Sequence, residues 1–444
     1  MDSTGLGGHM DTNDFIGSFA QENVSFSTQI IKTARVGDNF YKVMIFVEDT
    51  RFVNAVPEKG WLNVPGSQRC KALTVSADTY AETASGLLQS WLYDLFGSGY
   101  TGDCILVSCG DVNITYEYTP VTPVDGSDIS GLDYYHSTDG GTSWEKASES
   151  TADTTTYTYA TRSEGTVDTT SFIEGMEEAY SIMKPYAYHK TVCAGSENAV
   201  NPAIAVSLAK LCMSDKGLLS GAVLLPFTTT TPENPESDPL YAALSAESCD
   251  AFMSAHQDPS RNGSLVSLGI ALALINGSGT PVGNNMEMTA TGMISSSGPE
   301  GLPLARSIRD LLAGKNIQTW KAVGDNTGNV AAFGANTLLG DVYSAIWILS
   351  YCTYMIKVRV AQLLTSGNFL KNADNYGRIV TTMNAVVGIF VNAGRIENYV
   401  CTAPSFESLP EASSDEIVVP NAWSATYVSN TRKVTITGTL YIGA

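Results

Sequence analysis

Apolar and polar residues alternate most regularly at the C-terminal end of this 444-residue chain. Val434, Ile436, Leu440 and Ile442 share one face of an extended segment, and polar residues share the other. This period of two predicts a half-buried strand. Burying these aliphatic side chains does not by itself offset the entropy lost when the segment becomes ordered. We therefore expect residues 430–444 to form an arm that pairs with strands of its own domain or of a neighbouring subunit.

Between residues 22 and 300, helical periodicity alternates with short apolar runs. Val24, Phe26 and Thr28 alternate with polar residues and predict an early strand. The other expected strands cover residues 40–47, 104–107, 191–193 and 221–226, and the expected helices cover residues 78–97, 172–183 and 202–213. This alternation is typical of an α/β layer built on a mostly parallel sheet.

Residues 110–171 interrupt that pattern with a different composition. Thr, Tyr, Asp, Ser and Gly dominate, and helical periodicity is absent, so the segment predicts an inserted β-rich domain. Between Asp111 and Ser171 there are 11 acidic and two basic residues, a balance of −9. So much negative charge predicts a solvated face, which we expect to point outward.

One motif within the insertion matches a known pattern. Ser137, Asp139, Gly141 and Trp144 follow the S-x-D-x-G-x-x-W spacing of the Asp-box found in sialidases and other β proteins. Asp and Gly favour a tight hairpin turn, beneath which the tryptophan can pack. A propeller would need several copies at regular spacing, and this chain has one. A stabilised structural hairpin is therefore favoured over a glycosidase site.

The C-terminal third predicts a fixed order of elements. A hairpin is expected at 317–323 and 330–333 around a Gly/Asn/Asp loop at 324–329. Helices are then expected at 341–364 and 376–391, and strands at 397–402, 416–419 and 434–442.

This order resembles the C-terminal domain of contractile-tail sheath proteins. Phe333-Gly334-Ala335-Asn336-Thr337-Leu338 is similar to the W-G-A-R-T-L segment of that family, and the long helix follows it directly. Gly394-Arg395-Ile396 is similar to the family's G-x-I strand start. The resemblance covers roughly 301–444, with Phe333 in place of Trp and Asn336 in place of Arg. For residues 22–300 the likeness is one of architecture only.

The resemblance implies an α/β (mixed α+β) multidomain fold, with a sheath core, an inserted β-rich domain and terminal strand-exchange arms. It implies that each subunit lends its arms to shared four-stranded sheets. The expected divisions are an N-terminal arm at 1–25, a middle domain at 26–109 and 172–300, the insertion at 110–171, a polymerisation domain at 301–429 and the arm at 430–444.

The function implied is that of a structural subunit of a bacteriophage tail sheath, which polymerises helically and contracts once without nucleotide or cofactor. The implied partners are further copies of the chain in hexameric rings, the tail tube protein, and the baseplate and tail terminator proteins. The implied location is the virion, assembled in the host cytoplasm.

Four cations are candidates for contact with the tube. The segment from Gly301 onward carries nine acidic and eleven basic residues, a balance of +2. Lys357 and Arg359 lie near the end of the long helix, and Lys371 and Arg378 lie around the next one. Lys357 and Arg359 are two residues apart and do not share one narrow helical stripe. Ordinary solvated charges are the alternative interpretation.

The charge, the apolar runs and the cysteine spacing argue against several other classes of function. A net charge of −20 argues against nucleic-acid binding. The apolar run 342–356 is too short to span a bilayer, and residues 1–10 lack the features of a signal peptide. The eight cysteines (70, 104, 109, 193, 212, 249, 352 and 401) show no metal-binding spacing. We expect free thiols, with room for cross-links formed after release into an oxidising medium.

Two other classes of protein are alternatives to the sheath. An enzyme or glycan-binding protein could use the Asp-box, but the sequence lacks a phosphate-binding GxxxxGK[ST] loop and a G-x-S-x-G elbow. Another self-assembling protein, such as a surface-layer or tail-tube component, should carry an export signal or be smaller.

Overall fold

The computed structural model describes most of the chain between residues 43 and 427. The described residues are 43–49, 60–82, 86–194, 199–214, 223–227, 232–256, 260–274, 287–289, 304–323, 326–334, 336–345, 370–401, 403–409 and 423–427, with 348, 352, 355, 356, 359, 360, 362 and 363. The chain divides into two compact units, Asp111–Phe172 and the remainder, Met1–Gly110 with Ile173–Ala444.

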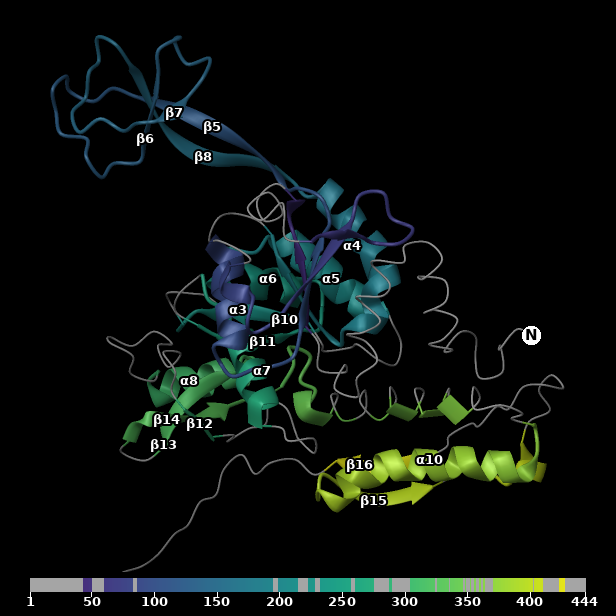
Figure 1. Cartoon of the computed structure of the whole chain (residues 1–444). Helices are drawn as coiled ribbons and strands as arrows, with labels where there is room; N and C mark the ends of the chain where they lie inside the picture. The colour runs from purple at the N-terminus through teal and green to yellow at the C-terminus, as the bar shows by residue number, and fades with distance from the viewer. Residues whose placement is uncertain are drawn as a thin grey trace, which may run out of the picture. The chain divides into compact units, whose positions relative to one another are not determined.

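A five-stranded sheet of order β2-β3-β4-β1-β9 lies at the centre of the larger unit (Figure 1). Its strands β1 (Val43–Val47), β4 (Cys104–Ser108) and β9 (His189–Cys193) run parallel, and every residue in them is buried. Burial on both faces explains why β1 and β4 are almost entirely apolar, whereas β9 also buries His189, Lys190 and Thr191.

The sheet is antiparallel at one edge, which the sequence analysis did not predict. β3 (Lys71–Val75) runs antiparallel to β4, and β2 (Leu62–Asn63) runs antiparallel to β3. At the other edge, the parallel pair β10 (Leu224–Phe227) and β11 (Phe252–Ala255) continues the layer through a parallel bridge between Lys190 and Val223. The expected mixed α/β class is confirmed.

Helices pack on this layer close to the expected positions. They are α3 (Gly86–Phe96), α4 (Thr170–Met183), α5 (Pro202–Ser214), α6 (Pro239–Ala246) and α7 (Gly263–Leu274). The helix expected at 78–97 is shorter: a 3-10 turn, Tyr80–Glu82, precedes it, and Gly86 has a φ of 61°. A left-handed backbone at Gly86 cannot continue a helix, so α3 starts there.

Close contacts hold α3 against α7. The Asp94 carboxylate on α3, whose side chain is fully buried, lies 2.5 Å from the Arg261 guanidinium and accepts a 2.7 Å hydrogen bond from the Asn262 backbone. A Cβ at Gly269 on α7 would lie 2.5 Å from the Leu95 carbonyl oxygen. The helices therefore approach at a distance that only glycine allows.

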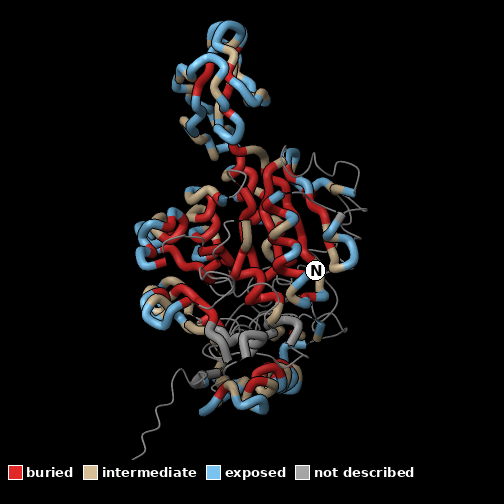
Figure 2. Tube along the Cα trace, turned by 90° about the vertical axis from the view of Figure 1, so that its left-hand side faces the viewer, coloured by how far each residue is buried: buried red, intermediate tan, exposed pale blue. Residues whose placement is uncertain are grey.

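The smaller unit, Asp111–Phe172, is a β-sheet module. Its antiparallel sheet has the order β5-β8-β6-β7, with β5 (Asn113–Val121), β8 (Thr158–Asp168), β6 (Tyr134–Ser137) and β7 (Glu145–Lys146). A small core forms around Ile129, Ala152 and Tyr159. Figure 2 shows few buried residues in this unit compared with the central sheet.

The C-terminal third begins with α8 (Arg306–Gly314) and a three-stranded antiparallel sheet of order β12-β14-β13. The expected hairpin is present as β13 (Thr319–Val323) and β14 (Asn326–Phe333), with β12 (Glu287–Thr289) beside β14. β14 starts four residues before the expected 330, so the loop is shorter than 324–329. The described residues between 343 and 363 are helical, as expected for 341–364.

The last elements are α10 (Ala373–Asn392), β15 (Ile396–Cys401), the 3-10 turn Phe406–Ser408 and β16 (Trp423–Tyr427). α10 and β15 match the helix and strand expected at 376–391 and 397–402. The strands expected around Val24 and at 416–419 and 434–442 lie outside the described residues, as do the arms at 1–25 and 430–444.

Candidate functional site

The described part of the C-terminal third ends in a two-stranded antiparallel sheet. β15 and β16 pair from Ile396 opposite Tyr427 to Cys401 opposite Trp423. Among the described residues, each strand pairs only with the other, so each has an outer edge that could accept a further strand. Val400 on β15 is 53% exposed. This strand pair is our candidate assembly site.

A bulge distorts β15 in its middle. The register shifts between Glu397 and Val400, and Asn398 has a φ of 52°. Asparagine tolerates this left-handed backbone better than most residues, which explains the residue type at the bulge. Bulges increase the local twist, so the outer edge of β15 is not flat.

α10 contacts β15 and supports the strand pair. Its chain turns at Gly394, whose φ is 66°, and the Arg395 backbone donates a 2.9 Å hydrogen bond to the Phe390 carbonyl. The Tyr399 hydroxyl on β15 donates to the Asn384 side chain on α10. Helix, turn and strand therefore form one folded piece that holds β15 in place.

The start of α10 is fixed by its own contacts. The Asn372 side chain caps the helix by accepting a 2.9 Å hydrogen bond from the Asn375 backbone. The Tyr376 hydroxyl donates a 2.7 Å hydrogen bond to the Pro404 carbonyl. Tyr376 and Ile379 form a buried cluster with Val360 of the preceding helix. α10 is thereby anchored both to the long helix and to the segment after β15.

The segment that resembles the sheath motif is held against the central layer. The Leu338 backbone donates a 2.9 Å hydrogen bond to the Ala251 carbonyl, and the Leu339 backbone donates one of 3.2 Å to the Asp250 carboxylate. Burial is the largest effect on Asp250 and raises its pKa. Gly334, with a φ of 76°, makes the turn into the segment. The motif residues therefore have a structural role at the start of the long helix.

Of the predicted tube-facing cations, Lys357 lies outside the described residues. Arg359 is partly exposed, and Lys371 and Arg378 are exposed. Arg378 donates a 3.2 Å hydrogen bond to the Asn375 side chain on the same helix turn. Lys371 lies immediately before the cap of α10, so both cations belong to the same end of that helix. Their contact with a tube stays a prediction. The arm residues Val434, Ile436, Leu440 and Ile442 also lie outside the described residues.

The Asp-box residues come together in the smaller unit as a tight turn. One oxygen of Asp139 accepts a hydrogen bond of 2.6 Å from the Ser137 hydroxyl and bonds of 3.0 Å from the backbones of Thr142 and Ser143. These hydrogen bonds, chiefly from the hydroxyls of Ser137 and Ser143, hold the pKa of Asp139 well below its usual range. The carboxylate is occupied by its own turn, the arrangement that a structural hairpin requires.

The tryptophan of this motif packs beside the turn. A Cβ at Gly141 would lie 3.1 Å from the Trp144 ring, and Gly141 has a φ of 93°. Trp144 stacks on Tyr118 of β5 at a centroid distance of 5.1 Å. The motif therefore ties the hairpin to the sheet of the unit.

In the part of the chain that the structure describes, no cluster of three or more His, Cys, Asp or Glu side chains could hold a metal ion. No helix among the described residues is long and apolar enough to cross a membrane.

β16 was not among the strands predicted from the sequence. Its sequence alternates Trp423, Ala425 and Tyr427 with the polar residues Ser424 and Thr426, which was a strand signal, but the run is short. β16 is the partner that turns β15 into a sheet, so the missed strand is half of the candidate site.

Comparison with solved structures fixes the fold. The sheath complex of the extracellular contractile injection system PVC, in its contracted state, aligns with a TM-score of 0.51 and 12% identity. The alignment covers 90% of this chain and 91% of that one. This chain has the fold of a contractile-sheath subunit. Because the match spans nearly both chains, the sheath fold includes the middle layer as well as the C-terminal third.

A second solved structure is the sheath tail protein Lin1278 from Listeria innocua. It aligns with a TM-score of 0.40 and 9% identity, over 89% of this chain and 91% of that one. No family model and no curated protein sequence matches the chain.

Proposed function

We propose that this chain is the structural subunit of a contractile tail sheath, which polymerises helically around a tail tube and contracts to drive the tube through a host envelope. The sheath fold over 90% of the chain is the observation that carries this proposal. The candidate site supports it, because β15 and β16 offer outer edges to which an arm from another subunit can add.

The proposed partners follow from this role. Further copies of the chain in hexameric rings form the helical polymer, and a tail tube lies inside it. Baseplate and terminator proteins close its two ends, and the particle is a phage virion assembled in the host cytoplasm. The energy for contraction is stored in the extended lattice, so the subunit acts as a structural protein and not as an enzyme.

Strand exchange gives the mechanism of assembly. In the proposed lattice, residues 430–444 of one subunit add to the β15–β16 pair of a neighbour. Paired backbone groups link the subunits, while the rest of each subunit moves as a body during contraction. The α10 contacts to β15 keep the accepting edge in place throughout.

Deleting residues 430–444 tests the proposal. Negative-stain electron microscopy of the purified full chain should show striated tubes, and the truncated chain should stay folded by circular dichroism but form no tubes. The matched control is Thr435→Ser with Thr437→Ser, which keeps the arm and its apolar face. Uniform particles from the full chain would contradict the sheath function, and tubes from the truncated chain would contradict the arm exchange.

A further inference from the structure

Two buried cysteines face each other at the end of β3 and β4. The last register pair of these antiparallel strands joins Lys71 to Ser108, so the next residues outward, Cys70 and Cys109, lie opposite each other. Cys70 is 1% exposed and Cys109 is fully buried. Both are free thiols: the Cys70 thiol donates to the Gly175 carbonyl, and the Cys109 thiol donates a 3.4 Å hydrogen bond to the Val107 carbonyl.

The backbone shows which kind of cross-strand pair this is. The Cys109 backbone donates a 3.1 Å hydrogen bond to Val47 on β1, and the Cys70 carbonyl accepts one of 2.9 Å from Val64. Both groups point away from the space between β3 and β4, so the two cysteines form a non-hydrogen-bonded pair. Cα atoms in such pairs are about 4.5 Å apart, which lies within the range that a disulfide spans.

We propose that Cys70 and Cys109 are an oxidative modification site, at which a small peroxide closes a cross-strand disulfide between β3 and β4. The Cys70 thiolate attacks one peroxide oxygen, the O–O bond breaks, and a sulfenic acid and hydroxide form. The Cys109 thiol then attacks the Cys70 sulfur, the S–O bond breaks, and water leaves. In total, two thiols and one hydrogen peroxide give one disulfide and two waters.

The surroundings favour this division of roles. The neighbouring Cys109 side chain has the largest effect on Cys70 and lowers its pKa, whereas burial raises the pKa of Cys109. Cys70 is therefore the thiol that ionises first, and Cys109 is the one that resolves the sulfenic acid. Since both sulfurs are buried, hydrogen peroxide can reach them more easily than a bulky disulfide reagent.

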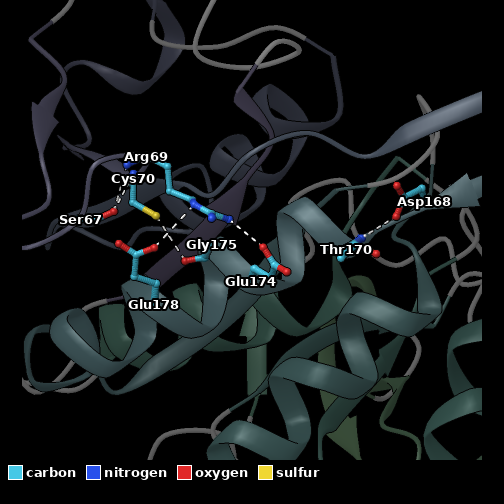
Figure 3. A network of polar contacts seen from close by, with 8 residues as sticks. All are labelled: Ser67, Arg69, Cys70, Asp168, Thr170, Glu174, Gly175 and Glu178. Atoms are coloured by element: carbon cyan, nitrogen blue, oxygen red, sulfur yellow. Dashed lines mark hydrogen bonds and ion pairs between the residues drawn. The ribbon is translucent and has the colours of Figure 1, made fainter.

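The pair is already held in place by its neighbours. The Cys70 thiol donates a 3.3 Å hydrogen bond to the Gly175 carbonyl on α4 (Figure 3). Arg69, the preceding residue, lies 3.2 Å from Glu174 and 3.7 Å from Glu178 on the same helix. Closing the disulfide would add a covalent link where this strand edge meets α4. The inference does not depend on the proposed function.

Peptide mapping of the full chain tests the proposal. A Cys401→Ser background removes the exposed thiol. After treatment with hydrogen peroxide, denaturation and alkylation without reduction, the protein should show two fewer alkylatable cysteines per chain than the untreated sample. Mass spectrometry should find one cross-linked peptide that joins Cys70 to Cys109. Tm should rise by about 3–5 °C and return when the protein is reduced.

Cys70→Ala is the test variant, and Cys212→Ala, at another buried cysteine on α5, is its matched control. In the same background, the control should form the cross-link and the Cys70 variant should not. An unchanged thiol count in the oxidised background protein, or a disulfide from Cys70 or Cys109 to another cysteine, would overturn the proposal. The peptide map of the background protein decides the question even if the Cys70 variant does not fold.

Discussion

At the scale of single residues, burial sets the protonation state of His189 in the central layer. It lies on β9 with no exposed surface, and its Nδ1 is 3.0 Å from the Tyr343 hydroxyl at the start of the long helix. Burial, with a smaller effect from neighbouring Lys190, lowers the pKa of His189 to about 3. The histidine is therefore neutral in the folded protein at neutral pH.

This pKa predicts that the protein loses stability in mild acid. The unfolded pKa of about 6.5 is above the folded one, so the unfolded chain binds a proton that the folded chain excludes. Above pH ~6.5 the histidine is neutral in both states and has no effect on the pH dependence. As the pH falls from there toward 3, the free energy of unfolding declines by at most about 1.4 kcal/mol per pH unit. Thermal unfolding between pH 7.5 and 4.5 should show a steeper decline for the wild type than for His189→Gln. Equal slopes would contradict this prediction.

The cations near α10 give a second prediction at the residue scale. Exposed contacts of this kind are individually worth well under ~1 kcal/mol, so only their repetition over many subunits would hold a tube. Lys371→Glu with Arg378→Glu should abolish assembly around an acidic tube but still allow tube-free polymers, as seen by electron microscopy. The charge-preserving pair Lys371→Arg with Arg378→Lys is the control. Normal loading of the tube by the reversed variant would remove this proposal.

At the scale of elements, two helices depend on glycines that allow close backbone contact. Gly269 does this for α7 against α3, and Gly175 does it for α4 against the end of β4. A Cβ at Gly175 would lie 1.9 Å from the Cys109 carbonyl oxygen. That atom belongs to the backbone and cannot move aside easily, so α4 would have to shift away from the sheet.

Gly175→Ala is therefore predicted to destabilise the protein by about 1–3 kcal/mol, despite the higher helix propensity of alanine. Gly377→Ala is the matched control, because Gly377 is also helical and a Cβ there meets no atom within 4 Å. The control should be neutral or stabilise α10 by about 0.5–1 kcal/mol. Denaturant unfolding with equal effects of both substitutions would show that the close contact at Gly175 is unimportant.

At the scale of the whole molecule, the chain leaves the central layer after β4 and returns to it in α4. The intervening unit, Asp111–Phe172, has its own sheet and core. Cys109 and Gly175, on either side of it in the sequence, are in direct contact. A chain that leaves and re-enters a core at one point can lose the intervening unit without having to bridge a long distance.

We accordingly predict that a short Gly/Ser linker can replace residues 111–172 with little effect on folding or polymerisation. Circular dichroism should show an intact α/β core in the shortened protein, and electron microscopy should show tubes like those of the full chain. Loss of folding would mean that the unit contributes to the core. Folding without tubes would mean that the unit takes part in assembly.

Several elements were predictable because the relevant information is local. The apolar runs of β1 and β4 follow from burial on both faces, and the periodicity of α5 and α10 follows from burial on one. The resemblance around Phe333–Leu338 placed the C-terminal elements in the right order. The Asp-box turn was predictable too, because its hydrogen bonds join residues at most four positions apart.

What the sequence by itself determined is therefore where strands, helices and turns occur, since each of these depends on neighbouring side chains. The tertiary structure decided which elements meet. β3 and β16 were missed because short strands are specified mainly by the strands they pair with. Cys70 and Cys109 lie opposite each other only because of the register between β3 and β4. Position 175 needs glycine only because α4 approaches Cys109 closely. Contacts between residues distant in sequence are set by the packing of whole elements, which no local pattern encodes.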